Sequence, residues 1–176
     1  MSLDEGRPWT VAVMGVSGSG KTSVAVPVAD ELQADFLEAD AFHPPANVAK
    51  MASGTPLTDE DRAPWLDILV EEIREAHDRG RPVVLTCSAL KRIYRDHLRQ
   101  ADDQMIFIHL TGDPELIMER MRERQHFMPP ALLESQVATL EELDDDERHA
   151  EVDVVASLPE VIRRVLRTVR TFLPDA

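Results

Sequence analysis

The segment Gly15-Val-Ser-Gly-Ser-Gly-Lys-Thr22 has the spacing of a loop that binds nucleotide phosphates. Glycines let backbone N–H groups turn inward around phosphate oxygens, and the start of the following helix adds its positive end. We expect Lys21 to reach the β- and γ-phosphates and the Thr22 hydroxyl to hold Mg²⁺. The predicted nucleotide-binding residues of this loop are Gly15, Ser17, Gly18, Ser19, Gly20, Lys21, Thr22 and Ser23.

A phosphate loop alone does not define a reaction. The chain lacks an Asn-Lys-x-Asp motif for reading a guanine base, which argues against a switch GTPase. ABC-type and motor ATPases usually have an apolar strand that ends in Asp, whereas the runs 82–87 and 105–110 are followed by Ser-Ala and Thr-Gly. Asp40 is the acid that closes a strand, where it can orient or deprotonate an acceptor hydroxyl beside the γ-phosphate. Spacing therefore favours a small kinase that acts on an anionic metabolite.

Several residues between positions 43 and 62 could bind that substrate. Arg62 follows an acidic run, so it either pairs with those acids or grips a substrate carboxylate with its planar fork. His43 precedes two prolines and either donates to a sugar hydroxyl or holds the turn. Lys50 either meets the anionic substrate or is a solvated surface lysine.

A second group of candidates follows the apolar run 82–87, because ligands of open parallel sheets bind at the carboxyl ends of strands. These candidates are Ser88, Lys91 and Arg95. Lys91, Tyr94 and Arg95 have i, i+3, i+4 spacing and should share one helix face, which could present two cations to a carboxylate. The single cysteine, Cys87, is expected to be buried packing, and it excludes a disulfide within the chain.

The elements that must position these residues alternate along the chain. Apolar runs at 10–15, 34–38, 82–87, 105–110 and 152–155 predict strands, and they alternate with helical patterns at 21–33, 58–79, 114 onward and the C-terminal segment. Continuous apolar strands separated by helices indicate a parallel sheet covered on both faces. The acidic run 141–147 is expected to be an exposed loop before the last strand.

Composition limits the classes of partner. The 176 residues suit one domain, and 33 acidic against 19 basic residues give a net charge of −14. This balance argues against nucleic acid and anionic membranes as partners, although a local basic cluster can still bind a small anion. No apolar run approaches a membrane span, and the acidic residues at positions 4 and 5 are unlike a secretory signal, so we expect a soluble cytoplasmic protein.

The chain resembles the bacterial-type gluconokinases, small P-loop kinases that phosphorylate D-gluconate on its 6-hydroxyl with ATP. The motifs that carry the resemblance lie at 15–22, 40–44, 47–66, 86–96, 126–128 and 136–140. The length and the lack of a linker predict one domain over 1–176. The resemblance covers about residues 11–155 and implies a three-layer α/β fold with a five-stranded parallel sheet like that of adenylate and shikimate kinases, and a homodimer. It also implies a substrate-binding insertion at about 41–57 and a lid at about 125–131. Gln125 stands where the family usually has glycine.

The resemblance also implies roles for individual residues. Arg120 and Arg124 would bracket the ATP phosphates, with Arg124 closing on the γ-phosphate, unless they form a basic helix face paired with neighbouring glutamates. The complete predicted site has three catalytic residues, Lys21, Asp40 and Arg124, and eight substrate-binding residues, Asp40, His43, Lys50, Arg62, Ser88, Lys91, Arg95 and Gln136. Two alternatives stay open: a kinase of another small acid, such as shikimate or another sugar acid, and a nucleotide-binding module without catalysis.

Overall fold

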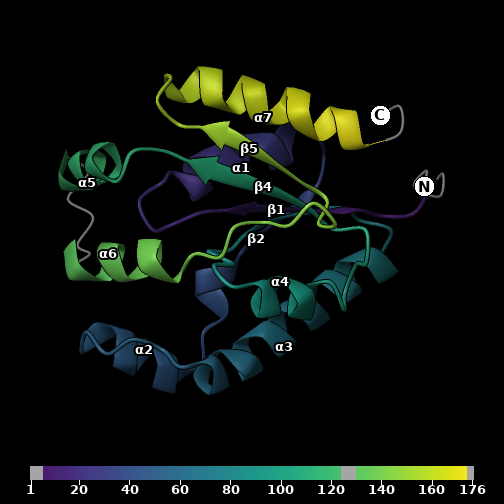
Figure 1. Cartoon of the computed structure of the whole chain (residues 1–176). Helices are drawn as coiled ribbons and strands as arrows, with labels where there is room; N and C mark the ends of the chain where they lie inside the picture. Colours follow the sequence, from purple (N-terminus) through teal and green to yellow (C-terminus); the bar gives the residue numbers. More distant parts are fainter. Residues whose placement is uncertain (1–5, 124–129, 174–176) are drawn as a thin grey trace.

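The computed structural model describes residues 6–123 and 130–173, which form a three-layer α/β arrangement around one sheet (Figure 1). All strand pairs are parallel, and the order across the sheet is β2-β3-β1-β4-β5. The strands are β1 (Thr10–Met14), β2 (Asp35–Glu38), β3 (Val83–Thr86), β4 (Ile106–Thr111) and β5 (His149–Asp153). The predicted five-stranded parallel sheet is therefore confirmed.

Helices cover both faces of the sheet. In Figure 1, α1 and α7 lie on one face and α3 and α4 on the other, while α2, α5 and α6 gather toward the carboxyl ends of the strands. The helices are α1 (Lys21–Glu31), η1 (Ala39–Phe42), α2 (Pro45–Ala52), α3 (Asp59–Asp78), α4 (Arg92–Leu98), α5 (Pro114–Glu123), α6 (Pro130–Thr139) and α7 (Leu158–Phe172). None of the helices that the structure describes is both long and apolar enough to cross a membrane.

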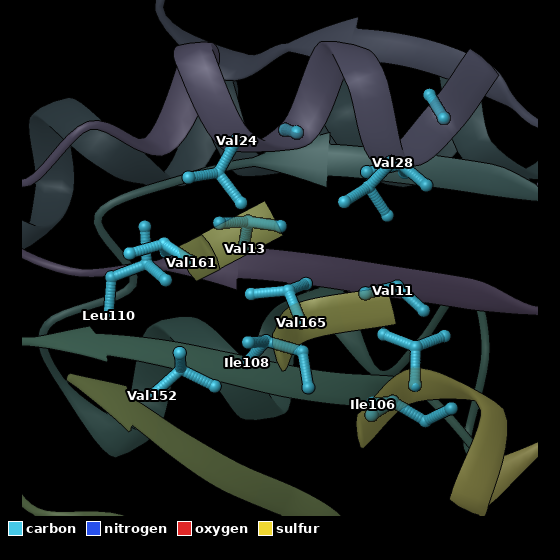
Figure 2. Packing of buried hydrophobic residues seen from close by; sticks show 14 of the residues in the cluster. Val11, Val13, Val24, Val28, Ile106, Ile108, Leu110, Val152, Val161 and Val165 are labelled. Carbon is cyan, nitrogen blue, oxygen red and sulfur yellow. The ribbon is translucent and has the colours of Figure 1, made fainter. Parts of the chain in front are cut away.

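The central strands are apolar at nearly every position because both of their faces are buried. Figure 2 shows the core on the α1 and α7 side of the sheet, in which Val24 and Val28 of α1 approach Val11 and Val13 of β1. The opposite face of the same strand packs Met14 against the α3 side of the molecule. Both faces of β1 are therefore packed, and β1 leads directly into the phosphate loop.

Helix α3 begins where its sequence predicts. The Thr58 hydroxyl accepts from the Asp61 N–H at 3.1 Å, and the Asp61 carboxylate accepts from the Thr58 N–H at 2.9 Å. This capping box satisfies two backbone donors at the start of the helix. The other end stops at Gly80, which takes a positive φ of 71°. The cap therefore sets the start of the helix that carries Arg62 and Trp65.

The prediction of an exposed loop at 141–147 is wrong for its last residue. Glu147 is buried and pairs with Arg95, while Arg92 binds Asp144 and Asp146 at the surface. Three arginines on and next to α4, Arg92, Arg95 and Arg99, pair with three of the acidic residues of this run. The last strand also begins earlier than the apolar run suggests, at His149, because the edge strand β5 keeps only Val152 fully buried.

Candidate functional site

The loop between β1 and α1 has the backbone shape of a phosphate-binding loop. Gly18 takes a φ of 81°, and a Cβ there would stand 2.3 Å from Cγ of Met121 in α5. A Cβ on Gly15 would stand 2.9 Å from the Leu110 carbonyl oxygen in β4. The Gly15 contact is with backbone that cannot move aside, and the positive φ of Gly18 disfavours any side chain, so both positions favour glycine.

Helix α1 starts at Lys21, and its N-cap Gly20 supplies no side-chain hydrogen bond. The first-turn N–H groups have no partner within the helix, and they lie at its positive end, which suits a phosphate group. The Lys21 ammonium donates to the carbonyls of Gly15 at 3.0 Å and Val16 at 3.1 Å, so it lies folded over the loop. Burial lowers the pKa of Lys21, while the carboxylate of Asp40 opposes that shift.

Glu38 is a candidate that the sequence reasoning missed. It ends β2 and accepts hydrogen bonds from the hydroxyls of Thr22 at 2.9 Å and Thr86 at 3.0 Å. The available signal was its place as the last residue of the strand, two positions before Asp40. The Thr22 hydroxyl and the Glu38 carboxylate are hard oxygen donors, so the residues present fit a Mg²⁺ ion.

A cavity of about 920 Å³ opens beside the phosphate loop. Its walls come from η1, from α2 with its following loop, from the start of α3, from the loop after β3, and from α6. These elements meet at the carboxyl ends of the strands, as expected for an open parallel sheet (Figure 1). The predicted site residues that line the cavity are Ser17, Asp40, His43, Arg62, Ser88, Lys91 and Gln136.

Arg62 does not pair with the acids that precede it. Its guanidinium donates to the Leu57 carbonyl at 2.5 Å and to the Tyr94 hydroxyl at 3.3 Å, and it lies 5.3 Å from the centre of the Tyr94 ring. Asp59 is instead bound by Lys91 and by Tyr94, and Asp61 by Lys50. Within the part of the chain that the structure describes, the Arg62 guanidinium faces the cavity without a carboxylate partner.

Asp40 and His43 lie together on the η1 side of the cavity, with 3.8 Å between the His43 Nε2 and the Asp40 Oδ1. The His43 ring stacks on Trp65 with ring centres 4.2 Å apart. Burial lowers the pKa of His43, Asp40 raises it and Arg62 lowers it. Cys87 also lines the cavity, and burial raises the pKa of its thiol to about 12, which keeps the thiol protonated at neutral pH.

Two predicted substrate-binding residues do not line the cavity. Lys50 pairs with Asp61 at 2.7 Å and so ties α2 to α3, and this hydrogen bond is the main cause that lowers the pKa of Asp61 to about 2. Arg95 is fully buried and binds Glu147 with two nitrogens, at 2.7 and 3.0 Å. The expectation that Lys91 and Arg95 share a helix face fails because Lys91 is the N-cap of α4, outside the helix.

The remaining predictions concern the nucleotide side and the lid. Arg120 in α5 donates to the carbonyls of Val154 at 2.5 Å and Val155 at 3.4 Å, in the segment between β5 and α7. Arg124 and most of the expected lid, 125–131, lie outside the described residues.

Gln136 in α6 lines the cavity and also contacts the phosphate loop. Its Oε1 accepts from the Ser17 N–H at 2.7 Å, and its Nε2 donates to the Ser17 hydroxyl at 3.1 Å. Two hydrogen bonds between one side chain and one residue fix both partners in orientation. The helix that follows the expected lid is therefore joined directly to the loop that would hold phosphates.

A parallel sheet of this order, with a phosphate loop after its central strand and a carboxylate after β2, defines a small P-loop kinase. Residues 11–143 match the family described as an AAA domain. Gluconokinase from Gluconobacter oxydans is 51% identical over 142 residues, 80% of each chain. Thermoresistant gluconokinase from Escherichia coli is 43% identical and covers 86% of this chain and 92% of its own.

Solved structures agree with these sequence relatives. A gluconokinase from Sinorhizobium meliloti has a TM-score of 0.85 and 44% identity over 94% of both chains. A sugar kinase from a Janibacter species has a TM-score of 0.88 and 50% identity, covering 93% of this chain and 95% of its own. The chain belongs to the gluconokinase family and is an ATP-using P-loop kinase, which confirms the family that the motifs indicate.

Proposed function

We propose that the protein transfers the γ-phosphoryl group of ATP to the 6-hydroxyl of D-gluconate, giving 6-phospho-D-gluconate and ADP. The observation that carries this proposal is the Arg62 guanidinium, which shares one cavity with Asp40 and has no described carboxylate partner. A sugar acid supplies both groups that such a cavity needs, a carboxylate for the arginine and a primary hydroxyl for the aspartate. The relatives' names, with identities of 39–51% in animals and bacteria, support the same substrate.

Each part of the site has a role in that reaction. The phosphate loop orients ATP through its backbone N–H groups, and Lys21 neutralises charge on the β- and γ-phosphates. Asp40 accepts the hydrogen bond of the acceptor hydroxyl and takes its proton as the new O–P bond forms. Arg62, supported by Tyr94, Lys91 and the loop residue Ser88, holds the substrate so that this hydroxyl points toward the phosphate loop.

Mg²⁺ fits the oxygen donors beside Lys21. Thr22 would bind the ion and Glu38 would orient its water shell, since Mg²⁺ keeps several waters in most protein sites. When bound, Mg²⁺ neutralises charge on the phosphate oxygens. Proton transfer and orientation of the substrate remain the roles of Asp40 and Arg62.

Other expectations stand as proposals of the same kind. The segment 41–57, which contains the end of η1 and all of α2, would act as the substrate-binding insertion of a single domain over 1–176. The lid at about 125–131, with Arg124, would close over the phosphates and limit hydrolysis of ATP by water. Arg120 would support the nucleotide side. A homodimer and a cytoplasmic location are predictions that analytical ultracentrifugation and cell fractionation would test.

The direct test is a coupled assay of ADP release with Mg-ATP and a panel of acids that includes gluconate, shikimate and other sugar acids. We expect strong turnover with gluconate and little hydrolysis of ATP alone. Higher kcat/KM with another acid would keep the kinase and replace the substrate. Binding of ATP without turnover of any acid would favour a nucleotide-binding module without catalysis.

Two substitutions test the roles inside the site. Lys21→Ala should abolish phosphoryl transfer, because the charge on the phosphates is no longer neutralised. Asp40→Asn should lower kcat by about 10²- to 10⁴-fold while ATP binding, measured by calorimetry, is retained. Near-full turnover of Asp40→Asn would show that Asp40 is not the group that takes the proton.

A further inference from the structure

The imidazole of His43 is held in place from three sides. Its ring stacks on Trp65 at an interplanar angle of 15°, and the Trp65 indole N–H donates to the Ala39 carbonyl at 2.7 Å, which fixes the ring beneath it. The Asp40 carboxylate lies near Nε2, and the Asn47 amide lies near Nδ1. The side chain of His43 is 5% exposed, so it has little freedom to turn.

Asn47 is a buried polar residue of α2, 4% exposed, that none of the predicted roles includes. Its Nδ2 donates to the Asp61 carbonyl at 2.9 Å and lies 3.4 Å from the His43 Nδ1. The bond to Asp61 fixes which way the amide points, because the opposite orientation would set two oxygens against each other. An amide nitrogen can only donate, so the His43 Nδ1 must accept.

We propose that Asn47 is a positioning residue that holds the proton of His43 on Nε2, so that His43 presents an N–H donor to a substrate hydroxyl beside Asp40. In a neutral imidazole one nitrogen donates and the other accepts, so an accepting Nδ1 requires a donating Nε2. This Nε2 is the ring nitrogen nearer Asp40 in the cavity wall.

The charged groups around His43 are consistent with a neutral ring. The Asp40 carboxylate favours the charged imidazolium, while Arg62 disfavours it, and burial, the largest cause, lowers the pKa. Trp65 and Asn47, which complete the surroundings, carry no charge. A second proton would also have to sit on Nδ1, directly opposite the N–H of Asn47.

The arrangement gives a hydroxyl oxygen two complementary partners. One lone pair of the oxygen accepts from the His43 Nε2–H, and its own proton is donated to Asp40. The other tautomer would offer that hydroxyl two acceptors and no donor, so it would be bound less tightly and oriented less well. The consequence for catalysis rests on the proposed function, whereas the tautomer itself does not.

The first experiment measures the tautomer directly. Protein labelled with ¹⁵N-histidine shows separate chemical shifts for protonated and unprotonated ring nitrogens, and the signals of His43 are assigned by their loss in His43→Gln. We expect a protonated Nε2 and an unprotonated Nδ1 in the wild-type protein at pH 7. A protonated Nδ1 in the wild-type protein would overturn the proposal without any need for a further variant.

Asn47→Asp then reverses the partner of Nδ1 at nearly constant size. A carboxylate can only accept, so the proton should move to Nδ1. The pKa of His43 should also rise, because the new negative charge favours the protonated imidazolium. Lys50→Met is the matched control: it removes another contact between α2 and Asp61 but leaves the Asn47 amide in place. We expect the control to keep the wild-type ¹⁵N signature, and an unchanged signature in Asn47→Asp would contradict the proposal.

Kinetics test the consequence in the site. Asn47→Asp and the isosteric Asn47→Leu should lower kcat/KM for the acid substrate about tenfold, with KM for ATP unchanged. In Asn47→Asp the acidic limb of the pH profile should also move to higher pH. If gluconate proves not to be the substrate, the ¹⁵N result still decides the role of Asn47, so the two proposals fail separately.

Discussion

Arg62 and Arg95 have the same side chain but opposite surroundings. Arg95 uses all of its nitrogens: two bind Glu147, and the guanidinium also donates to the carbonyls of Ala89, Leu90 and residues 141–142. Arg62 donates to one carbonyl and one phenol hydroxyl and faces a cavity. The buried arginine has its counter-charge inside the fold, whereas the cavity arginine lacks one among the described residues.

The difference separates a structural arginine from a binding one. A buried charge must be neutralised by its own protein, because leaving it unpaired costs several kcal/mol. An arginine at the wall of an open cavity can instead stay partly solvated until an anion arrives. An arginine that lacks a carboxylate partner at a cavity wall is therefore a better indicator of ligand binding here than an arginine's position in the sequence.

Between these two arginines, the larger expected effect on catalysis is that of removing Arg62. Arg62→Ala should lower kcat/KM for the acid substrate by roughly 30- to 1,000-fold, because losing one partner of a charged hydrogen-bonded contact costs about 2–4 kcal/mol. The melting temperature should change little. Arg62→Lys, the matched control, keeps the charge but loses the fork and should recover only part of the loss. Equal KM values for the acid in all three proteins would remove the contrast between the two arginines.

Removing Arg95 should act on stability instead. Arg95→Met leaves Glu147 buried without its main partner, so the free energy of unfolding should fall by about 3–5 kcal/mol in urea titrations. The folded fraction should keep its KM for the acid. Arg92→Met, which breaks surface ion pairs on the same helix, should cost no more than about 1 kcal/mol. A large rise in KM with unchanged stability for Arg95→Met would return Arg95 to the substrate site.

Acid titration tests the same ion pair through its carboxylate, Glu147. Burial alone would raise the pKa of Glu147, but hydrogen bonds from Arg95 and Arg99 outweigh it and lower the pKa to about 2. In the unfolded chain the pKa of a glutamate is about 4.3. At pH values above this, the lowered pKa of Glu147 stabilises the folded protein by about 3 kcal/mol, and this contribution is lost as the pH falls toward 2.

The measurement is the free energy of unfolding between pH 5 and pH 2 for the wild-type protein and Glu147→Gln. The variant should be less stable at pH 5 and should show a flatter dependence on pH, since its side chain does not titrate. Parallel curves for the two proteins would mean that Glu147 is not the carboxylate responsible.

We expect the smallest effect for Lys91, which lines the cavity as Arg62 does but has a carboxylate partner as Arg95 does. It lines the cavity but already pairs with Asp59 at 3.0 Å. Lys91→Met should therefore raise KM for the acid only a few-fold, because the partner carboxylate has offset most of its charge. A loss as large as that of Arg62→Ala would show that the ion pair opens when substrate binds.

Local patterns predicted much of the fold correctly. The phosphate loop, the capping box at Thr58 and the apolar central strands depend on residues close together in the chain, so their spacing is visible in the sequence. The predicted bounds of the edge strand β5 were less accurate, because its exposed face interrupts the apolar run. The acidic segment ending at Glu147 was read as solvated since charge is usually exposed, and its buried partner lies 52 positions away.

The candidate site was predicted less evenly. Asp40, His43, Arg62, Ser88 and Lys91 follow motifs or strand ends, and all of them line the cavity. Glu38 was missed because its partner Thr22 lies in another element. Asn47 was missed because its contact with His43 depends on the orientation of both side chains, which spacing does not define. Lys50 and Arg95 were assigned to substrate because an unpaired and a paired cation look alike in a sequence.

By itself, the sequence determined the phosphate loop, the alternation of strands and helices, and the family of kinases, since each depends on local spacing and residue type. Only the tertiary structure decided which cations face the substrate and which hold the fold together. The reason is physical: the fate of a charge depends on whether a counter-charge lies within a few ångströms, and in this protein those counter-charges come from distant parts of the chain.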